Sequence, residues 1–132
     1  MVDTSARLQG LRVLIVEDEL IIAMELEGLL RSLGCIPLEP VPNIGKALRT
    51  LADEPPDAAL LDVNLQGERV TPVAEALQAK GIPFVLVTGY GNERLNEAAL
   101  RDAVYLRKPV DASKLRRALA KVVAGREPDR PG

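Results

Sequence analysis

The stretch RVLIVEDELIIAMELEGLLRSLG, residues 12–34, decides the fold class. It opens on a near-continuous apolar run, which indicates a strand buried on both faces and hence a parallel sheet. Apolar residues then recur at helical spacing, at Ile22, Leu26, Leu29 and Leu33. Gly34 can end this helix because glycine readily adopts the left-handed backbone conformation. The stretch therefore predicts one strand followed by one covering helix.

The same unit recurs along the whole chain. Five apolar runs begin 23, 22, 25 and 21 residues apart, about one strand plus one helix; they are residues 12–17, 35–39, 57–62, 82–87 and 103–106. This alternation predicts an α/β, flavodoxin-like three-layer sandwich, with five helices covering a five-stranded parallel sheet. Pro37 cannot donate to a central ladder, so the second strand belongs at an edge. The strand order 2-1-3-4-5 satisfies that constraint.

Capping residues predict the limits of the second and third helices. Asn43 is a good N-cap for a helix that continues to Asp53, where two prolines follow. Thr71 is the predicted N-cap of the third helix, with Pro72 in the first helical position. Gly81 marks the end of that helix.

The sequence pattern is weaker for the fourth helix than for the fifth. The fourth is expected near residues 92–101. Asp111 should cap the fifth, in which the predicted buried residues are Leu115, Ala118, Leu119 and Val122.

The length of 132 residues suggests about one domain. We expect it to span residues 11–125, with residues 1–10 and 126–132 as short tails. The apolar stretches are far shorter than the ~20 residues that cross a bilayer, and the N-terminus lacks a signal-peptide pattern. The expected location is therefore the cytoplasm, without membrane association.

Composition excludes several classes of function. The 17 basic and 19 acidic residues give a formal net charge of −2, without a basic run long enough for a nucleic-acid groove. Histidine is absent, which excludes Ser-His-Asp and Cys-His catalysis and histidine-ligated zinc. Cys35 is the only cysteine, so no intrachain disulfide can form, and we interpret it as a small apolar strand residue.

Polar residues follow the ends of four predicted strands: Glu17 and Asp18, Asp62, Thr88 and Lys108. In this sheet, ligands bind at the carboxyl ends of the strands beside the point where the strand order reverses. Carboxylates gathered there repel one another unless a cation binds or a pKa rises. Oxygen ligands alone select a hard cation, usually Mg²⁺. Each residue taken alone also has a purely structural explanation, as a helix start, a turn residue or a surface lysine. The prediction of a binding site therefore rests on the placement of all of them at the ends of four strands.

At these positions the sequence resembles the receiver domain of two-component response regulators. The resemblance covers about Leu11 to Gly125 and rests on four motifs in order: LIVEDE at 14–19, LLDVN at 60–64, VTG at 87–89 and YLRKP at 105–109. It implies that Asp62 is the phosphoacceptor. It further implies that Glu17 and Asp18 hold Mg²⁺ together with Asp62 and the backbone carbonyl of Asn64.

The resemblance also implies a conformational switch. Thr88 would move to bind a phosphoryl oxygen, and Tyr105 would then turn inward. Lys108 would pair with the phosphate, and Pro109 would follow it through a cis peptide bond. Two departures from the common pattern are Glu17 in place of aspartate and Gln66 where many receivers have proline. Tyr90, two residues after Thr88, is bulky and could shield the phosphorylated form from water.

The resemblance implies a sensor histidine kinase or histidine phosphotransferase as phosphoryl donor and a protein as downstream target. The phrases DVNLQGE and FVLVTGYG resemble stand-alone receivers associated with HWE-type kinases and stress signalling. Such a single-domain response regulator is not an enzyme beyond Mg²⁺-dependent self-phosphorylation and slow self-dephosphorylation. The fourth helix, fifth strand and fifth helix would form its output face or a homodimer contact. Output, relay and phosphate sink stay open as roles.

Three other functions compete with this interpretation. A haloacid-dehalogenase phosphatase needs a second acid two residues after its nucleophile, where this chain has Asn64. A nucleotide-binding domain needs a glycine-rich turn after the first strand, where this chain has an acidic triplet, residues 17–19. A receiver-like adaptor that binds proteins without phosphorylation is the alternative that the sequence leaves open.

Overall fold

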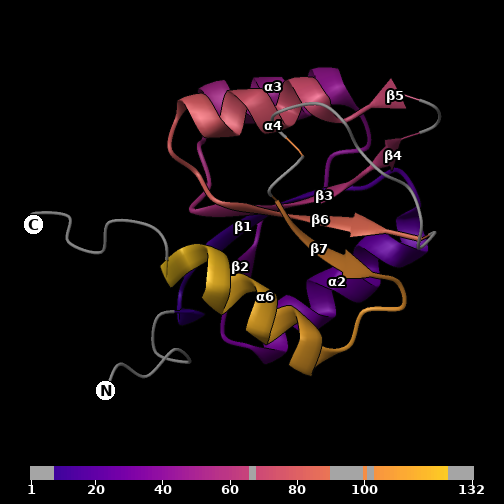
Figure 1. Cartoon of the computed structure of the whole chain (residues 1–132), viewed down its shortest axis with the longest axis vertical. Coiled ribbons are helices and arrows are strands. Elements are labelled where there is room, and N and C mark those ends of the chain that lie inside the picture. The colour runs from indigo at the N-terminus through magenta and orange to yellow at the C-terminus, as the bar shows by residue number, and fades with distance from the viewer. Residues whose placement is uncertain (1–7, 66–67, 90–99, 101–102, 125–132) are drawn as a thin grey trace, which may run out of the picture.

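The computed structural model describes residues 8–65, 68–89, 100 and 103–124. Strands and helices alternate along nearly all of this length, as Figure 1 shows. In chain order the elements are β1 (Arg12–Val16), α2 (Leu20–Ser32), β2 (Ile36–Pro37), α3 (Ile44–Asp53), β3 (Ala58–Asp62), β4 (Asn64–Leu65), β5 (Glu68–Arg69), α4 (Thr71–Ala79), β6 (Phe84–Thr88), β7 (Val104–Arg107) and α6 (Ala112–Ala124).

The main sheet has five parallel strands in the order β2-β1-β3-β6-β7. This is the predicted order 2-1-3-4-5, and β2 with Pro37 lies at an edge as expected. Cys35 is buried immediately before β2 and outside it. Burial raises the pKa of its thiol to about 11, so the side chain behaves as a small apolar group.

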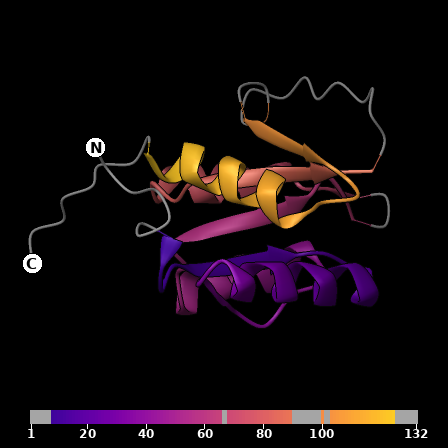
Figure 2. The same cartoon turned by 90° about the horizontal axis from the view of Figure 1, so that it is seen from below.

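Helices cover both faces of the sheet. Figure 1 shows α3 and α4 on one face and α2 with α6 on the other. Figure 2, seen from the side that α2 and α6 cover, shows these two helices in front of the strands. Side chains alternate along β1, so that Leu14 and Val16 join the core beneath α3 and α4, while Val13 and Ile15 join the opposite core. The predicted three-layer sandwich is confirmed.

The predicted caps of α3 and α6 are present. The Oδ1 atom of Asn43 accepts a hydrogen bond of 2.8 Å from the backbone N–H of Lys46. The Oδ1 atom of Asp111 accepts one of 2.8 Å from the backbone N–H of Lys114. Gly34, just past α2, has a φ of 87°, the left-handed conformation that ends a helix.

The predicted N-cap of α4 is wrong by one residue. The helix begins at Thr71, and Val70 is its N-cap. The Val70 carbonyl accepts hydrogen bonds from Val73 and Ala74, while the valine side chain is buried in the core. Packing of Val70 therefore sets the start of the helix, and Pro72 is tolerated because the first-turn N–H groups have no helical partners.

The predicted buried face of α6 needs one correction. Leu115, Ala118 and Leu119 are buried as expected, but Val123 takes the fourth buried position and Val122 is half-buried. Residues 115, 119 and 123 are four apart and therefore share the face that meets the sheet. Val122 still packs against the edge of the same core.

One element was not predicted at all. Directly after β3, the strands β4 and β5 form a short antiparallel hairpin that pairs Asn64 with Arg69 and Leu65 with Glu68. The predicted fourth helix and the residues Gln66 and Tyr90 lie outside the described residues, apart from Leu100. Among the helices that the structure describes, none has the length and apolar character needed to cross a membrane.

Candidate functional site at the carboxyl edge of the sheet

The fold brings the ends of four parallel strands to one edge. Asp62 is the last residue of β3, and Thr88 is the last residue of β6. Glu17 follows β1 directly, and Lys108 follows β7. Because these strands are parallel and paired in continuous register, their carboxyl ends stay level, and side chains from distant parts of the chain meet.

Three carboxylates form the centre of this edge. One oxygen each of Glu17, Asp18 and Asp62 lies within 4.8 Å of the others. Glu17 is 3% exposed and Asp62 is 6% exposed, whereas Asp18 is half-buried. Two unit charges about 4 Å apart repel by about 4 kcal/mol at an effective dielectric constant near 20. The cluster therefore carries strong repulsion unless a proton or a cation reduces its charge.

The carboxylate of Glu17 is buried and only partly paired. Its Oε2 atom accepts a hydrogen bond of 3.1 Å from the backbone N–H of Glu19. Its Oε1 atom is buried without a hydrogen-bond partner, although the Lys108 Nζ atom lies 3.4 Å away. Burial raises the pKa of Glu17 to about 7, and the charge of Asp62 adds to this, whereas the Glu19 N–H and Lys108 act in the opposite direction.

Lys108 brings a positive charge to this cluster. Its Nζ atom lies 3.4 Å from Glu17 and 3.8 Å from Asp62. Its backbone N–H donates a hydrogen bond of 2.8 Å to the Thr88 carbonyl, which ties the turn after β7 to the end of β6. The Lys108–Pro109 peptide bond is cis. One lysine thus faces two buried carboxylates.

The remaining predicted residues lie on β4, β6 and β7. Thr88 is 8% exposed at the end of β6. Tyr105 lies on β7 with 39% of its surface exposed, and its hydroxyl donates a hydrogen bond of 3.1 Å to the Leu100 carbonyl. Asn64 begins β4 two residues after Asp62. The sequence does not predict the contacts of Glu17 with the Glu19 N–H and of Tyr105 with the Leu100 carbonyl, because neither follows a recognised capping or turn pattern.

The donor set fits a hard divalent cation. Three carboxylates gather at one point, and a buried Glu17 oxygen lacks a hydrogen bond. All ligand atoms are oxygens, which Mg²⁺ and Ca²⁺ prefer over softer metals. A bound cation would relieve the repulsion and satisfy the unpaired oxygen. The residues present therefore suit the Mg²⁺ that the sequence predicted.

Comparison with known proteins agrees with this geometry. Residues 13–120 match the family model of the response regulator receiver domain. The chain belongs to this family. Receiver domains are non-enzymatic signalling domains of two-component systems that partner with histidine kinases, and the cluster of Glu17, Asp18 and Asp62 is typical of their Mg²⁺ site. The family prediction is confirmed.

The receiver domain is similar in sequence or structure to several individual proteins. It is 34% identical over 114 residues to the sensory transduction protein LytT of Bacillus subtilis, covering 84% of this chain but only 47% of that protein, about half its length. The solution structure of SdrG from Sphingomonas melonis is 43% identical with a TM-score of 0.77, covering 86% of this chain and 97% of SdrG. The PhyR receiver domain of Erythrobacter litoralis is 25% identical with a TM-score of 0.80, covering 96% and 99%.

Proposed function

We propose that residues 11–125 form a receiver domain that accepts a phosphoryl group on Asp62 from a sensor histidine kinase or a histidine phosphotransferase. The observation that carries this proposal is the position of Asp62. Its carboxylate is buried at the end of β3, beside two further carboxylates, with the Lys108 ammonium 3.8 Å away. The proposed nucleophile and the proposed phosphate-pairing cation therefore lie close together at the carboxyl edge of the sheet.

The metal part of the proposal assigns ligands by residue. Glu17, Asp18, Asp62 and the backbone carbonyl of Asn64 would hold Mg²⁺, with Glu17 reaching it directly or through water. When bound, Mg²⁺ supplies charge neutralisation for the carboxylates and the incoming phosphoryl group. The rest of the chemistry belongs to side chains of this chain.

Phosphoryl transfer requires little covalent chemistry from the protein. An ionised Asp62 oxygen forms a bond to phosphorus while the bond from phosphorus to the donor histidine nitrogen breaks, and that nitrogen keeps the electron pair. Lys108 then pairs with a phosphoryl oxygen in place of a carboxylate. Because the nucleophile is already an anion, no general base is needed, which agrees with the absence of histidine from the chain.

The charge of the phosphoryl group on Asp62 would trigger a conformational change that serves as the signal. A phosphoryl group adds about −1.5 to −2 charges and three acceptor oxygens. Thr88, buried at the end of the neighbouring strand, would donate its hydroxyl to one of these oxygens. Tyr105 would exchange its present bond to the Leu100 carbonyl for an inward position, and the face around β7 and α6 would change with it.

We propose protein partners on both sides of this switch. A kinase of the HWE type would supply the phosphoryl group, and a downstream protein, or a second copy through the face of β7 and α6, would receive the signal. The motif resemblance and the likeness to SdrG and the PhyR receiver domain support this direction. Self-phosphorylation, slow self-dephosphorylation and a location in the cytoplasm belong to the same proposal.

The test is Mg²⁺-dependent labelling with a small phosphodonor such as acetyl phosphate. The wild-type chain should gain one acid-stable, base-labile phosphoryl group, and Asp62→Asn should gain none. Asp53→Asn, at an exposed aspartate that ends α3, is the matched control and should be labelled like wild type. Undiminished labelling of Asp62→Asn would remove Asp62 from this role. Absence of labelling from any donor would favour the phosphorylation-independent adaptor.

A further inference from the structure

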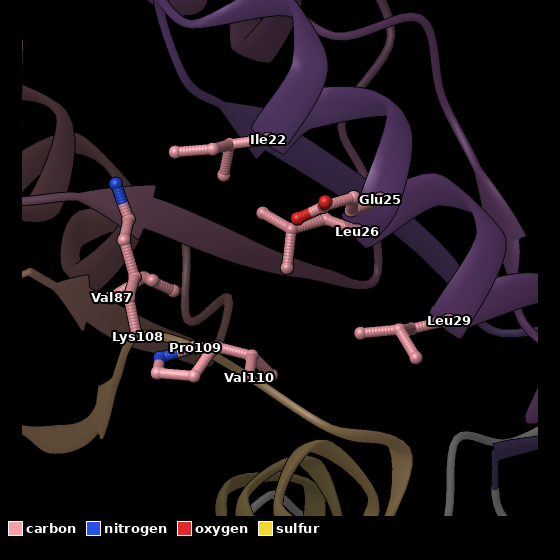
Figure 3. Close-up of a pocket in the computed structure, with 8 residues that line it drawn as sticks. All are labelled: Ile22, Glu25, Leu26, Leu29, Val87, Lys108, Pro109 and Val110. Carbon is pink, nitrogen blue, oxygen red and sulfur yellow. The ribbon is translucent and has the colours of Figure 1, made fainter.

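A pocket of about 260 Å³ is lined in part by Lys108, whose Nζ atom lies near Glu17 and Asp62 of the acidic cluster. Figure 3 shows it between α2 and the turn that follows β7. Its walls come from three places, with Val87 of β6 between the helix and the turn; the lining residues are Ile22, Glu25, Leu26, Leu29, Val87, Lys108, Pro109 and Val110. The proposed phosphoryl-transfer chemistry uses only Lys108 of this set.

The volume is large enough for a small organic group. An engineered apolar cavity of about 150 Å³ is known to take up benzene. Ligand pockets in proteins begin at roughly 300 Å³, so this one is near the lower limit. Most of its lining is aliphatic, with Leu26 and Val87 fully buried behind the half-buried Ile22 and Leu29. A single aromatic ring or a compact aliphatic group fits these dimensions.

The charged side chains at the pocket indicate which kind of ligand it would favour. Glu25 is exposed at the rim, and within the part of the chain that the structure describes it forms no ion pair. The Lys108 ammonium is engaged by Glu17 and Asp62, and Figure 3 shows it pointing away from Glu25. The apolar walls are therefore accompanied by one uncompensated carboxylate, which favours a ligand with a positive charge.

We propose that this pocket is a second binding site, for a small molecule with a compact apolar body and a protonated amine. The apolar body lies against Leu26, Leu29 and Val87, and the ammonium group pairs with Glu25. The ligand also touches the aliphatic part of Lys108 and the adjoining Pro109. Because Lys108 faces Glu17 and Asp62 on its other side, occupancy of the pocket and cation binding at the acidic cluster are linked.

Phenethylammonium is a suitable probe, and neutral 2-phenylethanol is its uncharged counterpart. Binding is measured by titration of backbone amide chemical shifts in the full chain, without a phosphodonor. For a ligand of this size we expect saturable binding with a dissociation constant of the order of 1 mM. The shifts should centre on α2 and the turn after β7. Absence of saturation, or shifts centred elsewhere, would overturn the proposal.

Two variants separate the contributions of shape and charge. Leu29→Trp fills the pocket and should weaken both probes at least tenfold; Ile22→Phe serves if the first variant loses its fold by circular dichroism. Glu25→Gln should weaken phenethylammonium by about three- to fivefold, the size of an exposed ion pair, and leave 2-phenylethanol unchanged. Glu27→Gln, on another face of α2, is the matched control and should change neither. Equal effects of Glu25→Gln on both probes would refute the charge assignment.

Linkage to the acidic cluster is measured with the same materials. Saturating Mg²⁺ should change the affinity for phenethylammonium at least twofold, and the probe should change the Mg²⁺ affinity by the same factor. Affinities that are independent of each other would remove the coupling through Lys108. Since none of these measurements involves phosphorylation, a failure of Asp62 labelling would leave the pocket proposal unaffected, and the reverse also holds.

Discussion

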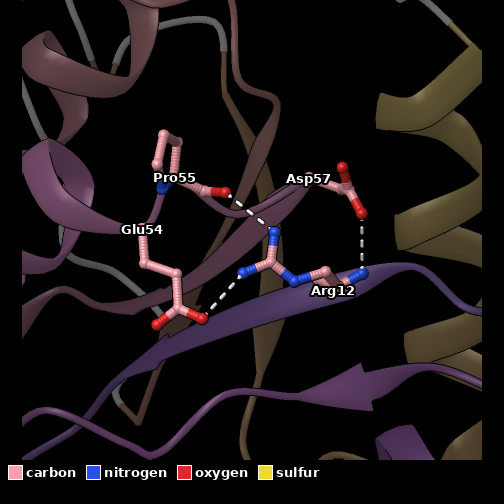
Figure 4. Close-up of polar contacts among 4 residues, drawn as sticks. All are labelled: Arg12, Glu54, Pro55 and Asp57. Carbon is pink, nitrogen blue, oxygen red and sulfur yellow. Dashed lines mark hydrogen bonds and ion pairs between the residues drawn. The ribbon is translucent and has the colours of Figure 1, made fainter.

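The two ends of the parallel strands, here called the amino edge and the carboxyl edge of the sheet, differ in how their charges are paired. At the amino edge, shown in Figure 4, Arg12 connects β1 to the segment that enters β3. Its backbone N–H donates to an Asp57 oxygen at 2.9 Å, and its guanidinium donates to the Pro55 carbonyl at 3.1 Å and to a Glu54 oxygen at 3.2 Å. The Asp57 backbone N–H returns a hydrogen bond of 2.8 Å to the Arg12 carbonyl.

At the carboxyl edge, one buried carboxylate is only partly paired. Three carboxylates gather there, Lys108 lies 3.4 Å and 3.8 Å from two of them, Glu17 and Asp62, and a buried Glu17 oxygen lacks a hydrogen bond. An edge that only has to hold strands together can pair its charges within the chain. An edge proposed to receive a cation and a phosphoryl group can instead keep an excess of negative charge. The comparison teaches that electrostatic imbalance, more than the presence of charge, marks the functional edge.

The substitution Asp62→Asn, at the carboxyl edge, should have the largest effect on the properties of the chain. Labelling by a phosphodonor should fall at least a hundredfold, because an amide cannot act as the phosphoryl acceptor. Without Mg²⁺ the same variant should be more stable than wild type, because one repelling charge has been removed from a buried cluster. Urea unfolding monitored by circular dichroism measures this. A variant that loses both labelling and stability would indicate that Asp62 is needed for folding.

The pH dependence of Mg²⁺ binding should give the next largest effect. With the pKa of Glu17 raised to about 7, the ionised form that a cation prefers increases about tenfold between about pH 6 and about pH 8. Mg²⁺ affinity, measured by calorimetry, should rise by about that factor. Glu17→Gln should abolish most of the increase, and an unchanged increase in that variant would assign it to another group.

Without Mg²⁺, the stability of the folded chain should decrease as pH rises, whereas the Mg²⁺ affinity increases. The unfolded Glu17 side chain ionises near 4.5, whereas the folded one ionises near 7, so the folded state holds more protons between these values. The free energy of unfolding should therefore decrease as pH rises through this window and level off above it. Thermal melting in a chelator measures the trend. Arg12→Ala, at the amino edge, should lower the whole curve without changing its slope.

Arg12→Ala should lower the free energy of unfolding by about 1–2 kcal/mol, because it removes one hydrogen bond to a backbone carbonyl and one exposed ion pair. Its backbone bond to Asp57 is kept. Urea unfolding gives the value. Mg²⁺ affinity should stay the same, since the substitution lies at the far edge of the sheet. A change in Mg²⁺ affinity above twofold would contradict the separation of the two edges.

Glu54→Ala should have the smallest effect. Glu54 is 66% exposed, so its ion pair with Arg12 is screened by solvent and contributes at most about 0.5 kcal/mol. The difference between this variant and Arg12→Ala then measures the hydrogen bond to the Pro55 carbonyl. Equal destabilisation by both substitutions would assign the whole contribution of Arg12 to the ion pair.

The sequence by itself determined the sheet and most of the described helix ends, and it predicted which side chains meet at the carboxyl ends of the strands. Buried parallel strands appear as apolar runs, Pro37 can only lie in an edge strand, and Asn43 and Asp111 bond to backbone groups three residues away. Each of these signals is local or follows from alternation along the chain. The gathering of Glu17, Asp18, Asp62 and Lys108 followed as soon as the strand order was known.

Tertiary structure alone decided the details that depend on packing and distance. The start of α4 at Thr71 follows from burial of Val70, and the hairpin after Asp62 comes from pairings of only two residues on each side. The raised pKa of Glu17 requires its burial beside Asp62, two residues that are far apart in the sequence. Local patterns record what a residue prefers. Burial and proximity between distant residues exist only after the chain has folded.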